Sequence, residues 1–440
     1  MSASIKIDPR NFIGGPFKAC PKCGGQEFGV LVPCVGPDSY TRRCRDFNCW
    51  HTIEIPLPEI KKRVIYIDQC AFSNIMKVLN PEAKGHERAA SEPLWRELYE
   101  SLDVVCHLQL AACPDSQEHE HESLTSPFHE SLKHTYEHFS CGLTFESAEQ
   151  IKLNQIASAA RCFVRKEELK FDFDPERVVH GRLHIWQGRI FATTSGVLSG
   201  TVDRLRQSRG QGHAGIQRIF KRWQVEKKGF REVFGQEINS YVPLILRQYQ
   251  ADQQNIAKIM SGLLRGEIPS LDAILPSPST RMLEMLKRIF EMEPTPTPAV
   301  TVKEFLESGL TSELPFNVIE SLMFASLSQR AASGQKKMPD QGTLNDISVV
   351  STLLPYCDAM FLDDGCRALL KDIPKGYKLP YSCVVFSKNN SQEFLAYLRS
   401  VRDSVTPEHL KIIEDVYGPN PLKPRGIYGV GAHRKPEHSE

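Results

Sequence analysis

The chain has 440 residues with 41% hydrophobic and 24% charged residues, which is the composition of an ordinary globular protein of two to four domains. A formal net charge of +1 gives no overall attraction to nucleic acid, so any nucleic-acid binding requires a local basic patch. No signal peptide opens the sequence and no apolar run approaches the ~20 residues of a membrane helix, so we expect a cytoplasmic protein without membrane association.

The first 58 residues are rich in Cys, Gly and Pro and form a module too small to bury much core alone. Thirteen cysteines in a chain without a signal peptide favour reduced thiols and a metal site over disulfides. A CxxC pair is followed about twenty residues later by a CxxxxC pair, a spacing that favours a tetrahedral Cys₄ site. The sequence therefore predicts a zinc ribbon with a structural Zn²⁺ on Cys20, Cys23, Cys44 and Cys49.

Other readings of this module stay open. Cys34 and His51 are alternative zinc ligands, and buried free cysteines are the alternative to a metal site. Arg42, Arg43 and Arg45 surround the third cysteine, where they either contact a phosphate backbone or form an exposed basic turn.

Residues 59–123 alternate strands and helices. The apolar run 64–67 predicts a short buried strand that ends at Asp68, and a helix to residue 79 follows. A second helix over 93–102 and a strand over 108–112 come next. This alternation indicates an α/β domain with a parallel sheet.

An acidic helix follows the strand at 108–112, with Ser116 as its N-cap. Ser116, His119 and Glu122 are three residues apart and lie on one side of this helix, so that Glu122 points back toward the sheet. His119 either orients water or contacts phosphate, or it is a polar surface residue. Glu118 and Glu120 are alternatives to Glu122, although their simpler role is to favour the helix dipole.

Residues 124–330 lack clear strand alternation and carry amphipathic helical patterns, such as those over 241–264 and 281–290. Pro- and Ser-rich breaks at 275–280 and 294–298 separate these patterns. We expect a large helical insertion that splits one α/β domain into two sequence segments.

Residues 204–231 of this insertion are strongly basic, with Phe220, Trp223 and Phe230 interleaved. Either the basic groups follow phosphates while the aromatic rings stack on unpaired bases, or the rings enter the core and the charges are simply solvated. On the first reading, the residues that contact substrate are Arg218, Lys221, Arg222, Lys227 and Lys228.

Residues 331–405 return to α/β alternation. Asp346 opens an apolar helical stretch, and a strand ending at residue 362 leads directly into Asp363 and Asp364. A strand over 382–386 and a helix over 392–401 follow. Residues 406–440 form the C-terminal tail, and we expect its part after Pro419, which is rich in Gly, Pro and basic residues, to be loosely ordered.

The carboxyl ends of parallel strands meet at one edge of a sheet, so acids that follow such strands converge there. Clustered carboxylates repel one another unless a cation binds, and Mg²⁺ or Mn²⁺ is the hard cation that takes oxygen ligands. This pattern predicts metal-dependent phosphodiester chemistry.

Three stretches together resemble PIN-like nucleases: VIYIDQCAFSN at 64–74, SxxHxxE at 116–122, and residues 345–364. The resemblance covers under half of the chain. It implies a parallel sheet with helices on both faces and a four-acid site for Mg²⁺ or Mn²⁺. Carried over by position, the four acids are Asp68, Glu122, Asp346 and Asp364.

The match departs from the family at its last motif. Leu362 stands where the family has Thr, and Asp363 is an additional carboxylate beside the expected Asp364. Ser73 and Asn74 occupy positions where small polar residues line the site in similar proteins. Ser116 is a further candidate substrate contact.

We therefore expect an endonuclease that hydrolyses phosphodiester bonds, and the resemblance favours single-stranded RNA over DNA. Because the family includes toxin ribonucleases, a role in prokaryotic antiviral defence is also an expectation. The alternative is a non-catalytic nucleic-acid-binding protein that uses the zinc ribbon and the basic segment. A protein partner and a homo-oligomer both stay open.

Overall fold

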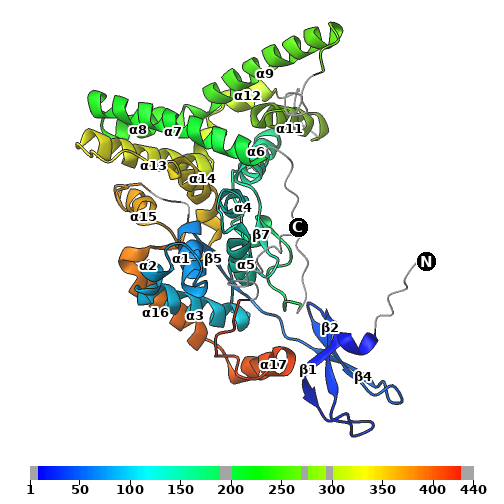
Figure 1. The fold of residues 1–440 in the computed structure, drawn as a ribbon. Helices are drawn as coiled ribbons and strands as arrows, with labels where there is room; N and C mark the ends of the chain where they lie inside the picture. The colour runs from blue at the N-terminus through cyan, green and yellow to red at the C-terminus, as the bar shows by residue number, and fades with distance from the viewer. Residues whose placement is uncertain are drawn as a thin grey trace.

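In a computed structural model of the chain, the described residues are 8–188, 201–268, 276–293, 301–377, 379 and 381–427, with the backbone alone for 33, 34, 201, 203–205 and 208. Figure 1 shows a small β-sheet at the N-terminal end, an α/β region in the middle and a group of helices at the far end. The predicted break at 294–298 and the end of the predicted tail lie outside the described residues.

The N-terminal module is a four-stranded antiparallel sheet in the order β1-β2-β3-β4, preceded by the short 3₁₀ helix η1 (Pro9–Phe12). Its strands are β1 (Ile13–Lys18), β2 (Phe28–Val35), β3 (Ser39–Cys44) and β4 (Thr52–Pro56).

The helix α17 (Pro407–Tyr417) docks on this module and lies before the segment after Pro419 that was predicted to be loosely ordered. Arg42 is buried and donates hydrogen bonds to the carbonyl oxygens of Pro16, Phe28 and Asp415 at 2.9, 2.9 and 2.6 Å. Lys18 pairs with the Asp415 carboxylate at 2.6 Å. Arg42 therefore joins the module to the rest of the chain and is not a phosphate contact.

A second sheet is wholly parallel, with strand order β10-β9-β5-β6. Its strands are β5 (Arg63–Ile67), β6 (Ala111–Ala112), β9 (Ala359–Phe361) and β10 (Val384–Phe386). Ile65 pairs with Ala359, so segments on either side of the helical region share one sheet. The predicted mixed α/β class with a parallel sheet is confirmed.

Helices cover both faces of this sheet. Ile65, Ile67 and Phe361 pack into a core with one set of helices, which are α1 (Gln69–Leu79), α3 (Pro93–His107) and α16 (Ser391–Asp403). Val64 and Met360 face a second core with α13 (Pro315–Ala332), α14 (Thr343–Leu353) and α15 (Asp364–Lys371). The short helix α2 (His86–Ala90) joins α1 to α3.

Two predicted boundaries in this region were wrong. The helix predicted over 93–102 continues to His107, because Val105 and Cys106 are buried with Leu102 against the same core. The strand predicted over 108–112 is consequently only two residues long, since Leu108 caps the helix and Gln109 adopts a positive φ of 58°.

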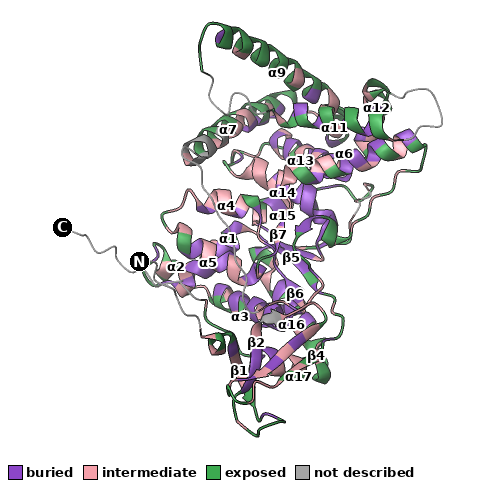
Figure 2. Cartoon of the chain, turned by 90° about the vertical axis from the view of Figure 1, so that its right-hand side faces the viewer, coloured by how far each residue is buried: buried purple, intermediate pink, exposed green. Residues whose placement is uncertain are grey.

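The region 124–330 is mainly helical, as expected. The helix just before this region is α4 (Gln117–Ser123). Besides α13, the helices within the region are α5 (His129–Ser140), α6 (Ala148–Arg165), α7 (Thr201–Glu226), α8 (Phe230–Ile238), α9 (Tyr241–Leu264), α11 (Pro278–Met292) and α12 (Val302–Glu307). One pair of strands was missed, β7 (Thr144–Phe145) and β8 (Val179–His180), because two-residue strands show no alternation. Figure 2 shows α9 as the most exposed helix. None of the helices in the described ranges is long and apolar enough to cross a bilayer.

Candidate functional site

Four cysteine thiols lie together in the N-terminal module. The Sγ atoms of Cys20 and Cys49 are 3.7 Å apart, those of Cys23 and Cys44 are also 3.7 Å apart, and all four lie within 4.8 Å of one another. Four thiolates at about 2.3 Å from one zinc ion have sulfur atoms about 3.8 Å apart. The cluster therefore fits one tetrahedral ion such as Zn²⁺, and four protein ligands leave no open position for catalysis.

Tight turns bring these thiols together. The Cys20 carbonyl accepts a hydrogen bond from Gly24 N–H at 2.9 Å, and Cys20 N–H donates to Gly25 at 2.8 Å. Gly24 has a φ of 74°, which favours glycine. In the second pair, Cys49 N–H donates to the Asp46 carbonyl at 3.1 Å, so the longer CxxxxC spacing still forms a closed turn.

Of the alternative ligands, His51 does not join this cluster. The His51 ring stacks on Phe28 with ring centroids 6.0 Å apart. The side chain of Cys34 lies outside the described residues. Arg45 pairs with Glu27 at 3.1 Å, so part of the basic turn is neutralised within the module.

We expect purified protein to contain about one zinc ion per chain by elemental analysis. Cys20→Ser and Cys44→Ser should each abolish zinc binding and destabilise the module, because three thiolates hold the ion weakly. Cys162→Ser is the matched control, since this partly exposed cysteine lies on α6 outside the cluster. A folded wild-type protein without any metal would contradict the prediction.

Carboxylates from four separate segments gather at the carboxyl edge of the parallel sheet. Asp68 follows β5 and caps α1, and Asp363 follows β9 and caps α15. Asp346 lies in the first turn of α14, and Glu122 lies near the end of α4. The charges of Asp68, Asp363 and Glu122 all act on Asp346, so the four groups share one electrostatic environment.

Burial and mutual repulsion raise the pKa values of these acids. Burial, followed by the charges of Glu122 and Asp363, raises the pKa of Asp68 to about 7. Burial, followed by the charges of Asp68, Asp363 and Glu122, raises the pKa of Asp346 to about 9. Burial also raises the pKa values of Asp363 and Glu122. Binding of protons or of a cation relieves such repulsion.

Asp363 faces this group more directly than Asp364. The Asp363 charge is one of the causes that raise the pKa values of both Asp68 and Asp346. The Asp364 carboxylate instead accepts a hydrogen bond from Asn389 N–H at 3.0 Å, which directs it toward the loop before α16. The geometry therefore favours Asp363 over the predicted Asp364 as the fourth acid.

These acids do not form a closed set of ligand atoms. Within the described ranges, the four cysteines are the one group of three or more candidate ligands whose atoms all lie within 4.8 Å. Mg²⁺ commonly binds through one or two carboxylates and keeps several waters, so a looser arrangement of acids suits this ion. The donor chemistry therefore fits a hydrated divalent cation.

His119 is a core residue and not a surface residue. Its side chain is 0% exposed, and its Nε2 lies 2.9 Å from the carbonyl oxygen of Ile67. The ring stacks on Tyr66 with centroids 5.3 Å apart, and burial lowers the pKa of His119 to about 4. With no exposed surface it does not reach a phosphate or a site water. It instead holds α4 against the end of β5.

Of the other residues predicted at this edge, Asn74 lines a cavity, whereas Ser73 and Ser116 do not. Ser116 is the N-cap of α4, as expected, accepting from His119 N–H at 3.3 Å; it is buried, which makes it a structural residue. Asn74 lines a cavity beside Asp68, whereas Ser73 is half-buried and does not line it. Glu118 lies close enough for its charge to raise the pKa of Glu122.

The aromatic rings of the basic segment are buried. Phe220, Trp223 and Phe230 are 0%, 2% and 8% exposed and belong to the core that contains α13 and α14. Of the two predicted alternatives, the rings therefore follow the second and enter the core, because the apolar faces of α7 and α8 pack inward. The cations on the opposite face, including Arg218 and Lys221, are exposed. The side chain of Arg204 lies outside the described residues.

Arg209 of this segment reaches the acidic edge. Arg209 of α7 lies 3.8 Å from Glu122, and both side chains are largely buried, with 20% and 29% exposed. Its charge opposes the rise in the pKa of Glu122. No local pattern distinguishes Arg209 from its basic neighbours, so sequence reasoning missed it.

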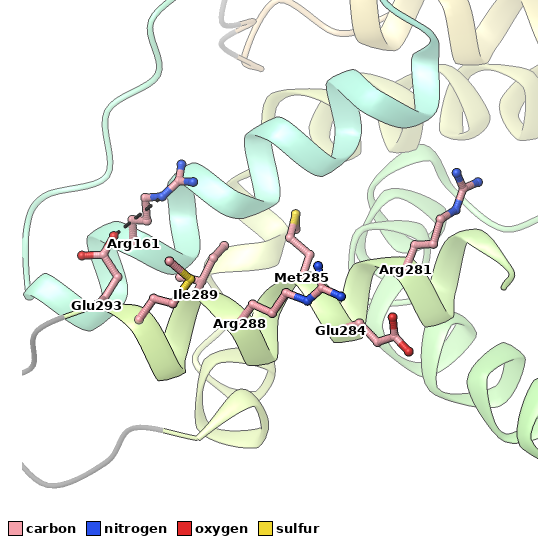
Figure 3. A pocket seen from close by; sticks show the side chains of 8 residues that line it. Arg161, Arg281, Glu284, Met285, Arg288, Ile289 and Glu293 are labelled. Atoms are coloured by element: carbon pink, nitrogen blue, oxygen red, sulfur yellow. Dashed lines mark ion pairs between the residues drawn. The ribbon is translucent and has the colours of Figure 1, made fainter.

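A cavity of about 480 Å³ lies away from this edge, between α6 and α11 (Figure 3). Arg161 and Glu293 form an ion pair at 3.8 Å on its wall, and Arg281 pairs with Glu149 at 2.6 Å. Its lining includes apolar side chains such as Met285 and contains no group of carboxylates or thiols. The acidic edge is therefore the stronger candidate for chemistry.

Comparison of the chain with protein-family models, with curated proteins and with solved structures found no match.

Proposed function

We propose that this protein is a metal-dependent nuclease that hydrolyses phosphodiester bonds, with single-stranded RNA preferred over DNA. The observation that carries the proposal is the meeting of Asp68, Glu122, Asp346 and Asp363 at one sheet edge, with raised pKa values. Such repulsion costs stability, and clusters of this kind are characteristic of functional sites. Their origin in four separate segments speaks against a chance surface cluster.

In the proposed mechanism, Asp68, Asp346, Asp363 and Glu122 would hold Mg²⁺ or Mn²⁺. The ion, when bound, lowers the pKa of a coordinated water and offsets charge on the phosphate. Arg209 adds a fixed positive charge at the same edge, where it can stabilise negative charge that develops on the phosphate. The buried His119 holds α4 against β5 and thereby positions Glu122.

The direct test is incubation of the protein with labelled single-stranded RNA and DNA in Mn²⁺, Mg²⁺ or EDTA. We expect cleavage in either metal, no cleavage in EDTA, and faster cleavage of RNA. Absence of cleavage under every metal condition would overturn the proposal. The expected cytoplasmic location, the role in prokaryotic defence and a protein partner stay predictions.

A non-catalytic nucleic-acid-binding protein is the second candidate. Three cations favour this candidate, namely Arg218 and Lys221 on α7 and Lys227 just after its end. Each of them is exposed and has no acidic partner within the described ranges. Arg222 and Lys228 of the predicted set both pair with Glu226, at 3.7 and 3.1 Å. The cleavage test separates the two candidates, because a binding protein has no need of the acids.

Replacing Arg218, Lys221 and Lys227 together by Glu should weaken nucleic-acid binding and lower its salt dependence by about one unit of log–log slope per lost contact. A triple variant of exposed lysines on other helices, Lys258, Lys287 and Lys303, gives the same change in net charge as a control. Fluorescence anisotropy at several salt concentrations measures both quantities. Equal affinity and slope in the two variants would show that these cations of the basic segment are simply solvated.

A further inference from the structure

A cavity of about 400 Å³ opens directly beside the acidic edge. Asp68, Asp363 and Asp364 line it from the ends of β5 and β9. One face of α1 forms a wall, since Cys70, Asn74 and Lys77 all line the cavity and recur at helical spacing. Arg88 of α2, Glu92 and Lys388 complete the charged part of the lining.

Two of the three cations in this cavity have no carboxylate partner. Lys388 is held by Glu92 at 2.6 Å, which neutralises both. Neither Lys77 nor Arg88 forms a salt bridge within the part of the chain that the structure describes, although the charge of Arg88 helps to lower the pKa of Glu92. Lys77 lies near enough to Cys70 that its charge opposes the rise in the pKa of that thiol, and its Cδ atom lies 3.9 Å from the position that a Cβ would take at Gly85, just before α2.

The charge balance of the cavity depends on a bound cation. Without one, the carboxylates of this edge, including Asp346 and Glu122 beside the cavity, outnumber Lys77 and Arg88, and an anion is repelled. A divalent cation cancels two of these carboxylate charges and so weakens the repulsion, and Lys77 and Arg88 then supply positive charge to an anion inside the cavity. Metal and anionic substrate are therefore expected to bind together.

The distance along α1 indicates which phosphate these cations contact. Asp68 and Lys77 are nine positions apart, which places their backbones about 14 Å apart along a helix. A phosphate held at the acids is too far away for Lys77 to share, whereas a phosphate further along the same strand is within reach. A cavity of about 400 Å³ admits a nucleotide unit and not a duplex.

We propose that Lys77 and Arg88 bind a backbone phosphate of a nucleotide adjoining the scissile bond in a single-stranded nucleic acid. The inference rests on the proposed nuclease function and adds the site that positions the strand. It predicts that the protein discriminates between substrates by length, because a dinucleotide without terminal phosphates (a dinucleoside monophosphate) contains only the scissile phosphate.

The test compares Lys77→Gln and Arg88→Gln with the control Lys84→Gln. Lys84 is an exposed lysine between α1 and α2 that does not line the cavity. For a strand of about twelve nucleotides, each cavity variant should raise KM about tenfold and leave kcat unchanged. This result is expected when the lost charged contact is equally strong in the bound substrate and in the transition state. For a dinucleotide, all variants should match wild type. Melting temperatures should also match, because both side chains are partly or fully exposed.

Two outcomes would overturn the inference: cavity variants that behave like Lys84→Gln on the long strand, or an equal rise in KM for the dinucleotide. Anisotropy of the labelled long strand with Mg²⁺ separates this result from failure of the proposed function. Weaker binding by both cavity variants supports the phosphate site even if no variant cleaves. A wild-type protein that neither binds nor cleaves the strand overturns both proposals.

Discussion

Asp346→Asn is expected to reduce nucleic-acid cleavage roughly 10²-fold or more, while the metal-free protein becomes equally or more stable. Asn keeps the shape of the side chain but removes a ligand charge from a group where burial and four neighbouring carboxylates oppose ionisation. Asp68→Asn should have the same two effects, because burial and neighbouring carboxylates also oppose ionisation of Asp68. Initial cleavage rates with Mn²⁺ and thermal melting in EDTA measure the two effects.

The same series decides between the adjacent acids. Asp363→Asn should lower cleavage far more than Asp364→Asn, because Asp363 faces Asp68 and Asp346. Asn also caps helices, so the start of α15 should be retained in the Asp363 variant. Asp403→Asn, on the exposed side of α16, is the matched control. An Asp68→Asn variant that cuts at the wild-type rate would refute the assignment of this edge as the active site.

Stabilisation of the protein by Mg²⁺ is expected to grow with pH. The pKa of Asp346 is raised from an unfolded value of 3.8 to about 9, and that of Asp68 from 3.8 to about 7. A raised carboxyl pKa means that the folded state holds its proton more tightly. Stability is therefore greatest where these acids are protonated, and it is lost as pH rises from about 4 toward 9.

Mg²⁺ competes with these protons, because a ligating carboxylate must be ionised. The melting temperature in EDTA should thus fall from about pH 5 to pH 9, and the gain in melting temperature from millimolar Mg²⁺ should increase over the same range. Asp346→Asn should flatten both trends. A Mg²⁺ effect that is independent of pH would argue against metal binding at the acidic edge.

Local sequence determined much of this fold. The run before Asp68 is a short strand because its apolar residues are buried on both faces of a sheet, and such runs are visible without a structure. The helix predicted over 241–264 has the same bounds in the structure as α9. The CxxC and CxxxxC pairs likewise predicted the cluster of Cys20, Cys23, Cys44 and Cys49, since each pair closes its own turn.

The tertiary structure decided the direction in which the side chains of the site point. The sequence could not place His119 in the core, because its burial depends on Tyr66, Phe72 and the Ile67 carbonyl from a distant segment. Adjacent acids such as Asp363 and Asp364 are equivalent in a sequence pattern until a helix cap and a neighbouring loop orient each one. Arg209 likewise differs from other cations of α7 only through the packing of α7 over α14. Hydrophobic periodicity is local and therefore predictable, whereas charge–charge contacts between remote segments depend on the whole fold.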